Sequence, residues 1–158
     1  MRNRLDGDRP SPFANRILAN DISPRMIEIA EQKASAEGIS NVTFQTIAFD
    51  DFTAPDESFD AVLGMSILHL VGDRDEAIRK VYALLKPGGV FISSTACLGD
   101  KMKFFKLIGP IGRALGLIPL VRVFSTAELV DSLTKAGFEI DHQWRPGKSP
   151  AVFIVAKK

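Results

Sequence analysis

Apolar runs typical of strands alternate with helical stripes of apolar residues from Arg16 to the C-terminus. The runs that predict strands lie at residues 17–19, 42–49, 59–65, 90–95, 138–144 and 151–156. Apolar positions at helical spacing predict helices that begin after Ser23, Asp73 and Ser125. This alternation predicts an α/β fold with a mostly parallel sheet, in which the last two strands form an antiparallel hairpin.

Residues suited to helix ends stand on both sides of each predicted helix. Ser23 followed by Pro24 is a favourable start for the first helix, and Gly38 is a favourable end. A glutamate follows Asp73 and Ser125 at the third position, which is the spacing of a capping box. The later helices end at Pro87-Gly88-Gly89 and at Gly137. These signals support the helices independently of the apolar pattern.

Two segments fall outside this alternation. Residues 1–15 are charged, and their apolar positions follow neither the strand period of 2 nor the helix period of 3.6. We therefore expect an irregular arm before a domain that spans residues 16–158. Residues 100–123 are apolar and basic, and glycines and prolines interrupt them. They predict an insertion that could serve as an active-site cover, a membrane-surface helix or simple packing. We favour the cover, because an insertion after this strand can reach over the carboxyl edge of the sheet.

The composition fits one globular domain. The length of 158 residues suits a single core, and 46% apolar with 25% charged residues excludes a disordered or fibrous protein. A formal net charge of +1 excludes recruitment of nucleic acid or an anionic membrane by an overall electrostatic field. No apolar run approaches the roughly 20 residues that a membrane-spanning helix needs. We therefore expect a small-molecule partner, without nucleic acid and without integral membrane contact.

The cysteine content and the N-terminal residues indicate a cellular compartment. Cys97 is the single cysteine, which excludes an intrachain disulfide framework and a cysteine-rich zinc site. The charged N-terminal residues lack the apolar region of a signal peptide. A cytoplasmic protein is therefore expected.

Asp21 is the first candidate for chemistry, because ligands of open α/β sheets bind beyond the carboxyl ends of the strands. It follows the apolar run 17–19 and precedes the start of a helix. Its two carboxylate oxygens can accept hydrogen bonds from both hydroxyls of a ribose. The same position also suits a solvated acid that the helix dipole stabilises. Taken alone, the residue leaves both interpretations open.

Four stretches together resemble the class I S-adenosylmethionine-dependent methyltransferases. They are Ala19-Asn20-Asp21-Ile22-Ser23-Pro24-Arg25-Met26, Phe49-Asp50-Asp51-Phe52, Asp56-Glu57-Ser58-Phe59-Asp60-Ala61-Val62 and Leu84-Leu85-Lys86-Pro87-Gly88-Gly89. The nearest branch is similar to the small-molecule methyltransferases of ubiquinone and menaquinone biosynthesis. The likeness covers residues 16–89 and extends more loosely to the C-terminus. It implies a Rossmann-like methyltransferase sheet, S-adenosylmethionine as cofactor, and methyl transfer to a small, apolar molecule.

The resemblance also implies which residues contact the cofactor. Asp21 would hold the ribose hydroxyls, and Ile22 would lie against the adenine. Ala48 stands where relatives carry an acid for the adenine amino group, so the backbone amide of Phe49 is the safer adenine contact. Met65 would face the methionyl part and the substrate. The neighbours that would add to these contacts are Met26 and Ser66. An in-line transfer depends mainly on alignment, so no catalytic residue and no metal is assigned.

One part of the family pattern is missing from this sequence. Relatives open with a strand, a glycine-rich turn and a helix, whose backbone N–H groups approach the methionyl carboxylate. Gly7 is the only glycine before Asp21, and residues 1–15 are too few for both a strand and a helix. In the family that strand lies at the centre of the sheet. We therefore expect weak cofactor binding, and unpaired strand edges that favour a homodimer. Whether Met1 is the natural start stays open.

Several other polar residues are weaker candidates for a catalytic or metal-binding role. His69 follows a strand end and could act as a general base, but a packing or capping histidine is the favoured interpretation. His142 lies on the predicted hairpin and is interpreted as structural. Asp50 and Asp51 lack the spacing of a calcium loop. Cys97 has no neighbouring histidine, which argues against a nucleophile.

Alternative functions stay open on the residues alone. The favoured function is S-adenosylmethionine-dependent methyl transfer to a small, apolar molecule. The first alternative is a truncated, non-catalytic methyltransferase-like domain that serves in binding or interaction, which the missing glycine-rich turn supports. The second is a nicotinamide-binding oxidoreductase, because an acid after a strand of this kind suits any adenosine ribose. Measured cofactor affinity separates the first alternative from the favoured function.

Overall fold

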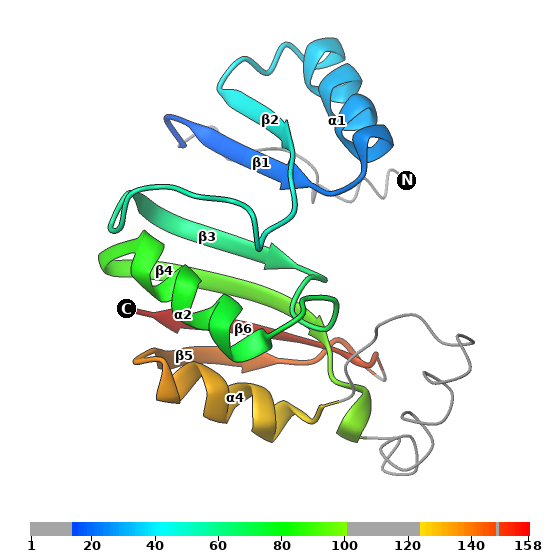
Figure 1. The fold of residues 1–158 in the computed structure, drawn as a ribbon. Coiled ribbons are helices and arrows are strands. Elements are labelled where there is room, and N and C mark those ends of the chain that lie inside the picture. Colours follow the sequence, from blue (N-terminus) through cyan, green and yellow to red (C-terminus); the bar gives the residue numbers. More distant parts are fainter. Residues whose placement is uncertain (1–13, 101–123, 148) are drawn as a thin grey trace. The chain divides into compact units, whose positions relative to one another are not determined.

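The computed structural model describes residues 14–100, 124–147 and 149–158. The chain divides into two compact units, Met1–Phe52, here unit 1, and Thr53–Lys158, here unit 2. Figure 1 shows the elements of both units. Most of the predicted N-terminal arm and nearly all of the predicted cover at 100–123 lie outside the described residues.

Unit 1 contains a strand, a helix and a second strand. They are β1 (Ile17–Asp21), α1 (Pro24–Ala36) and β2 (Val42–Thr46). The two strands pair in parallel, with Ile17 opposite Val42 and Asp21 opposite Thr46. Such a parallel pair needs a crossover, and α1 supplies it.

Both ends of α1 follow from local chemistry. The Ser23 side chain accepts a hydrogen bond from the backbone N–H of Met26, and Pro24 is the first helical residue. After the helix, Gly38 has a φ of +68°, which glycine adopts without steric cost. These features confirm the predicted start and end of the first helix.

Strand β2 is shorter than predicted. It ends at Thr46 rather than at Phe49. The chain turns directly afterwards, because the carbonyl oxygen of Ala48 accepts hydrogen bonds from the backbone N–H groups of Asp51 and Phe52, at 3.2 and 3.0 Å. The prediction to Phe49 was therefore wrong at this end of the strand.

Unit 2 is built on a sheet with helices on one face. Its elements are β3 (Phe59–Met65), α2 (Arg74–Leu84), β4 (Leu85–Ala96), the 3-10 helix η2 (Leu98–Asp100), α4 (Thr126–Lys135), β5 (Glu139–Trp144) and β6 (Ala151–Lys157). In the described residues the strands lie in the order β3-β4-β6-β5. Strands β3 and β4 are parallel, whereas β6 is antiparallel to both β4 and β5. The predicted antiparallel hairpin is confirmed, and the sheet as a whole is mixed.

Helix α2 ends earlier than predicted. The sequence predicts a helix that continues to Pro87, but Leu85 is a fully buried strand residue with extended backbone angles. The carbonyl oxygens of Ala83 and Leu84 accept hydrogen bonds from the backbone N–H groups of Glu57 and Ser58, at 2.9 and 3.0 Å. These contacts with the two residues before β3 satisfy carbonyl groups in the last turn of the helix, so the chain can leave the helix before Pro87.

The N-caps of the two helices in unit 2 differ in completeness. Ser125 and Glu128 form the full capping box that the sequence predicts. Asp73 accepts hydrogen bonds from the backbone N–H groups of Asp75 and Glu76, at 2.9 and 3.0 Å. Asp73 is therefore the N-cap of α2, as predicted.

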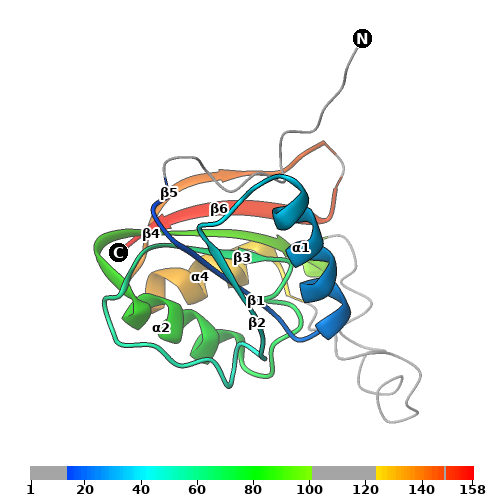
Figure 2. The ribbon, with the colours of Figure 1, turned by 90° about the horizontal axis from the view of Figure 1, so that it is seen from above.

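The core of unit 2 lies between the sheet and helices α2 and α4, which Figure 2 shows on the same side of the sheet. Alternate residues of β4 and β6 point into it, including Phe91 and Ile154. The helices contribute Ile78, Leu129 and Leu133, and each of these side chains is fully buried. No helix within the described ranges is long and apolar enough to cross a membrane.

Candidate functional site

The predicted adenosine contacts of unit 1 lie at one edge of its sheet. Asp21 is the last residue of β1, and Ile22 follows it. The backbone N–H of Ile47 donates a hydrogen bond to the carbonyl oxygen of Asp21, at 3.1 Å, directly before Ala48 and Phe49. Because β1 and β2 are parallel, their carboxyl ends share this edge. The structure therefore brings together the residues that the sequence assigned separately, and their roles stay predictions.

The Asp21 carboxylate is held in place by its own loop. Its Oδ1 accepts a hydrogen bond from the backbone N–H of Ser23, at 2.8 Å, and the residue is half-buried. Among the described residues no hydrogen bond to Oδ2 occurs. One oxygen thus orients the side chain, and the other can accept a hydrogen bond from a ligand hydroxyl.

Apolar side chains stand exposed beside this carboxylate. The exposed fraction is 73% for Ile22 and 53% for Met26. Exposed apolar side chains next to a fixed polar group are typical of the wall of a small-molecule site. An acid for the ribose and an apolar wall for the base are the groups that an adenosine needs, so the described residues of unit 1 fit the adenosine half of a nucleoside cofactor.

The carboxyl end of β3 in unit 2 carries a second set of exposed apolar residues. Met65 ends the strand with 54% of its surface exposed, and Leu70 in the following loop is 52% exposed. Ser66 between them has a φ of +56°, which is uncommon for a residue other than glycine. Its backbone N–H donates a hydrogen bond to the carbonyl oxygen of Ser94, at 2.7 Å, which holds this conformation.

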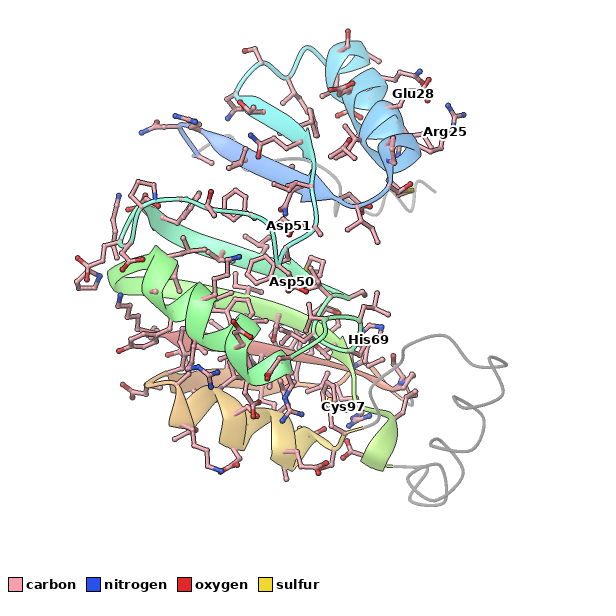
Figure 3. All side chains as sticks on the ribbon, in the orientation of Figure 1. Arg25, Glu28, Asp50, Asp51, His69 and Cys97 are labelled. Carbon is pink, nitrogen blue, oxygen red and sulfur yellow. The ribbon has the colours of Figure 1, made fainter. Side chains whose placement is uncertain are left out.

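His69 lies in the same loop, beyond the carboxyl end of β3 (Figure 3). The residue is half-buried, and burial lowers the pKa of its imidazole below the ordinary value. Its Nδ1 is buried without a hydrogen-bond partner. The sequence favoured a packing or capping role for His69. The side chain is half-buried, but no described group forms a hydrogen bond with its Nδ1.

A polar cluster of Asp100, Thr126 and Arg145, here the Asp100 cluster, lies beyond the carboxyl end of β4 in unit 2. The sequence analysis missed it. Asp100 Oδ1 accepts a hydrogen bond from the backbone N–H of Thr126, at 2.9 Å, and its Oδ2 accepts from the Thr126 hydroxyl and pairs with the Arg145 guanidinium. Arg145 also donates to the carbonyl oxygen of Ser149, at 3.1 Å. The cluster joins η2, α4 and the loop before β6. No sequence motif marks it, because its members are far apart in the chain.

The surroundings of the remaining candidates do not favour a catalytic or metal-binding role. Cys97 is fully buried, and burial raises the pKa of its thiol, which does not suit a nucleophile. His142 is exposed on β5, with its ring centroid 5.5 Å from that of Trp144. Asp50 and Asp51 are exposed in the turn after β2. Within the described ranges, no three metal-ligating side chains come together.

The comparison with known proteins identifies the family. A family model described as a methyltransferase domain matches residues 12–136. This chain belongs to that methyltransferase family. The fold and the family that the sequence predicted, a class I S-adenosylmethionine-dependent methyltransferase, are confirmed, and S-adenosylmethionine is the cofactor of this class.

Curated relatives match part of their length. A ubiquinone biosynthesis O-methyltransferase of Cereibacter sphaeroides is 29% identical over 127 residues, which are 78% of this chain and 51% of the relative. The ubiquinone/menaquinone biosynthesis C-methyltransferase UbiE of Hydrogenovibrio crunogenus is 32% identical over 90 residues, which are 52% of this chain and 35% of the relative. The chain thus spans about a third to a half of these relatives.

Solved structures share the fold over most of the chain. The crystal structure of an S-adenosylmethionine-dependent methyltransferase from Mesorhizobium loti has a TM-score of 0.69 at 18% identity. It covers 92% of this chain, and this chain covers 81% of it. At this level of identity the likeness concerns the fold.

Proposed function

We propose that this chain takes part in the transfer of a methyl group from S-adenosylmethionine to a small, apolar molecule. The observation that carries the proposal is the edge of unit 1, where an oriented Asp21 carboxylate stands beside the exposed side chains of Ile22 and Met26. The matching family model and the methyl-transfer functions that name the quinone-biosynthesis relatives support the same reaction.

The residues of unit 1 would bind the adenosine half of the cofactor. Asp21 would accept hydrogen bonds from the ribose hydroxyls, and Ile22 with Met26 would pack against the adenine. Ala48 and Phe49 follow the neighbouring strand and would contact the edge of the same base. When bound, the cofactor supplies a methyl group on a positively charged sulfur.

The residues of unit 2 would contribute on the acceptor side. Met65 offers an exposed apolar side chain at the carboxyl end of β3. An apolar acceptor can pack on such a surface, which orients its nucleophilic atom and excludes water. Alignment of two reactants supplies much of the rate in a displacement of this kind.

Direct titration tests cofactor binding. The contacts that we assign in unit 1 hold only the adenosine half of the cofactor, so we expect a dissociation constant well above the low micromolar range, up to about 1 mM. Ligand-observed NMR detects such weak binding, and calorimetry measures it when it is tighter. If neither S-adenosylmethionine nor adenosine binds at millimolar concentration, the assignment of unit 1 is wrong. Low-micromolar binding would show that further residues hold the rest of the cofactor.

The Asp21→Ala variant tests the ribose contact. Loss of a charged hydrogen-bond partner should weaken adenosine and S-adenosylmethionine binding by about 1.5 to 3 kcal/mol, roughly a factor of ten or more. Glu31→Ala removes an exposed acid from α1 and serves as the matched control, with unchanged affinity. Equal affinities of Asp21→Ala and the unchanged chain would exclude the ribose role, provided that circular dichroism shows the same fold.

A non-catalytic binding or interaction domain is the second candidate function. In this case the chain would bind adenosine or a partner without methyl transfer. A radiolabel assay with S-adenosylmethionine and catechol at high protein concentration separates the two functions.

Pairing with a second copy is a further proposal for this chain. Within the described residues β1 pairs with β2 alone and β3 with β4 alone, so each strand keeps one edge without a ladder partner. A second copy could supply the missing hydrogen bonds by strand pairing. Sedimentation velocity should then show dimers whose fraction grows with concentration, whereas a monomer at all concentrations would exclude the pairing.

A further inference from the structure

Two segments that are distant in the sequence meet beyond the carboxyl end of β4 in unit 2. The backbone N–H of Gly99 donates a hydrogen bond to the carbonyl oxygen of Phe124, at 2.9 Å. A Cβ atom on Gly99 would lie 2.6 Å from the carbonyl carbon of Phe124, so a larger residue would force the two backbones apart. The residues on either side of 101–123 are therefore in direct backbone contact.

The Asp100 carboxylate adds a side-chain link to this backbone contact. Its Oδ1 accepts a hydrogen bond from the backbone N–H of Thr126, at 2.9 Å, and its Oδ2 accepts from the Thr126 hydroxyl. Thr126 is the first residue of α4, so the carboxylate also meets the positive end of the helix dipole. One side chain thus ties η2 to the start of α4.

Arg145 holds both sides of the contact from a third segment. Its guanidinium pairs with Asp100 Oδ2 and donates hydrogen bonds to the Thr126 hydroxyl, at 3.0 Å, and to the carbonyl oxygen of Ser149, at 3.1 Å. A guanidinium carries its donors in a planar fork, so it can bind several acceptors at once. Arg145 therefore connects η2 and α4 to the loop between β5 and β6.

Buried residues mark where this arrangement joins the core of unit 2. Cys97 is fully buried, and its backbone N–H donates to the carbonyl oxygen of Pro150, at 3.0 Å. Phe124 is 4% exposed, and the Arg74 guanidinium lies 4.6 Å from the centre of its ring. The side chains of Asp100 and Arg145 are instead about a quarter exposed, 25% and 26%. Partly exposed hydrogen bonds of this kind belong to the regions of a fold that open first.

We propose that Gly99 and the Asp100 cluster form a latch, here the Asp100 latch, which opens as one unit while the sheet of unit 2 stays folded, and that Arg145 locks it closed. On opening, Gly99 and Asp100 separate from Phe124 and Thr126. The spacing between the two ends of residues 101–123 then increases. The Asp100 latch lies at the carboxyl end of β4, the edge at which open α/β sheets bind ligands, so its opening alters that edge.

Hydrogen exchange of the full chain, followed by NMR at urea concentrations below the unfolding transition, tests this cooperative opening. The amides of Gly99 and Thr126 should share one opening free energy with a shallow dependence on urea, because a local opening exposes little surface. Ile154 lies in the middle of β6 between β4 and β5, and its amide should exchange through global unfolding, with a steep dependence. A steep dependence for Gly99 and Thr126, equal to that of Ile154, would overturn the proposal.

The Arg145→Met variant tests the lock. Loss of a charged hydrogen-bond partner should speed exchange of the Gly99 amide about tenfold or more, with the shallow urea dependence retained. Gly99 is a suitable reporter because the substitution does not touch its acceptor, the carbonyl oxygen of Phe124. Lys135→Met removes the exposed ion pair with Asp131 on α4 and is the matched control, with an unchanged Gly99 rate.

The conservative variant Arg145→Lys keeps the positive charge but not the planar fork, so it should speed exchange of the Gly99 amide by a smaller factor. It also serves as the deciding variant if Arg145→Met does not fold. An unchanged Gly99 rate in the folded Arg145 variants would overturn the role of Arg145. Acceleration of Thr126 alone would show that the contacts break one by one, and the Asp100 latch would not exist as a unit.

Discussion

The two units of the chain differ in how much apolar surface they bury. Unit 2 has a core of fully buried side chains, which include Ile78, Leu129 and Ile154. In the described part of unit 1 the buried apolar side chains are Ile27, Ala34 and Phe52, each with 8–9% of its surface exposed. Since a buried apolar side chain contributes about 1.5 to 3 kcal/mol, unit 2 has much more stabilisation of its own.

This difference bears on where the cofactor would bind. The proposed cofactor contacts Asp21, Ile22 and Met26 belong to the weakly packed unit. Regions that bind ligands are often drawn from the less stable parts of a fold. A ligand that binds unit 1 should therefore also stabilise it by mass action.

A core substitution in each unit gives the largest expected contrast. Leu129→Ala should lower the free energy of unfolding of unit 2 by about 2 to 5 kcal/mol, because it leaves a cavity in a fully buried position. Trp144 is the only tryptophan and lies in unit 2, so its fluorescence follows the unfolding of this unit in urea.

Ile27→Ala in unit 1 is the comparison variant. If the units unfold independently, it leaves the Trp144 transition in place, while hydrogen exchange of the α1 amides becomes faster. An equal shift of the Trp144 midpoint by both variants would show that the two units unfold as one, and the contrast between them would disappear.

The Asp100 cluster should add an acid-dependent contribution to unit 2. Burial opposes the charged Asp100 carboxylate, but hydrogen bonds from Thr126 and the guanidinium of Arg145 outweigh it and hold its pKa below the ordinary value. A lowered pKa in the folded state means that the stabilisation is present above the unfolded pKa of about 3.9 and is lost as the pH falls through the folded value. Asp100→Asn should cost about 1 to 2 kcal/mol at pH 7, since the side chain is 25% exposed.

Urea titrations at pH 7 and at pH 3 measure this contribution. The difference between Asp100→Asn and the unchanged chain should shrink at the lower pH. Asp131→Asn removes an exposed ion pair with Lys135 and should leave stability unchanged at both values. A constant difference across the pH range would mean that the Asp100 charge does not stabilise the fold.

Helix caps give the smallest contrast between the units. Ser125→Ala should destabilise unit 2 by about 1 kcal/mol, because it breaks a complete capping box. Ser23→Ala in unit 1 should cost less, since its side chain accepts a single, longer hydrogen bond of 3.4 Å and Asp21 already accepts from the Ser23 backbone N–H. Urea unfolding of unit 2 and hydrogen exchange of α1 measure the two effects. A larger loss for Ser23→Ala would reverse the expected order of the units.

Local patterns in the sequence were sufficient to predict much of the fold. The bounds of β3, the N-caps Ser23 and Ser125, and the C-terminal hairpin are confirmed. The position of Asp21 at a strand end was predictable for the same reason. Caps, periodicity and turns depend on residues within a few positions of one another, so a single sequence carries them.

Contacts between distant residues decided the points where the predictions failed. Leu85 joined a strand because hydrogen bonds from Glu57 and Ser58 complete the last turn of α2. The Asp100 cluster joins three segments that no local pattern connects.

The sequence by itself determined the class of fold, the candidate carboxylate and the family. Only the tertiary structure decided which side chains stay exposed, as Ile22 and Met26 do, and which polar atoms lack a partner, as His69 Nδ1 does. Exposure and hydrogen-bond satisfaction depend on everything that surrounds a side chain in space. These properties exist only after the chain has folded, and the proposal for the cofactor rests on them.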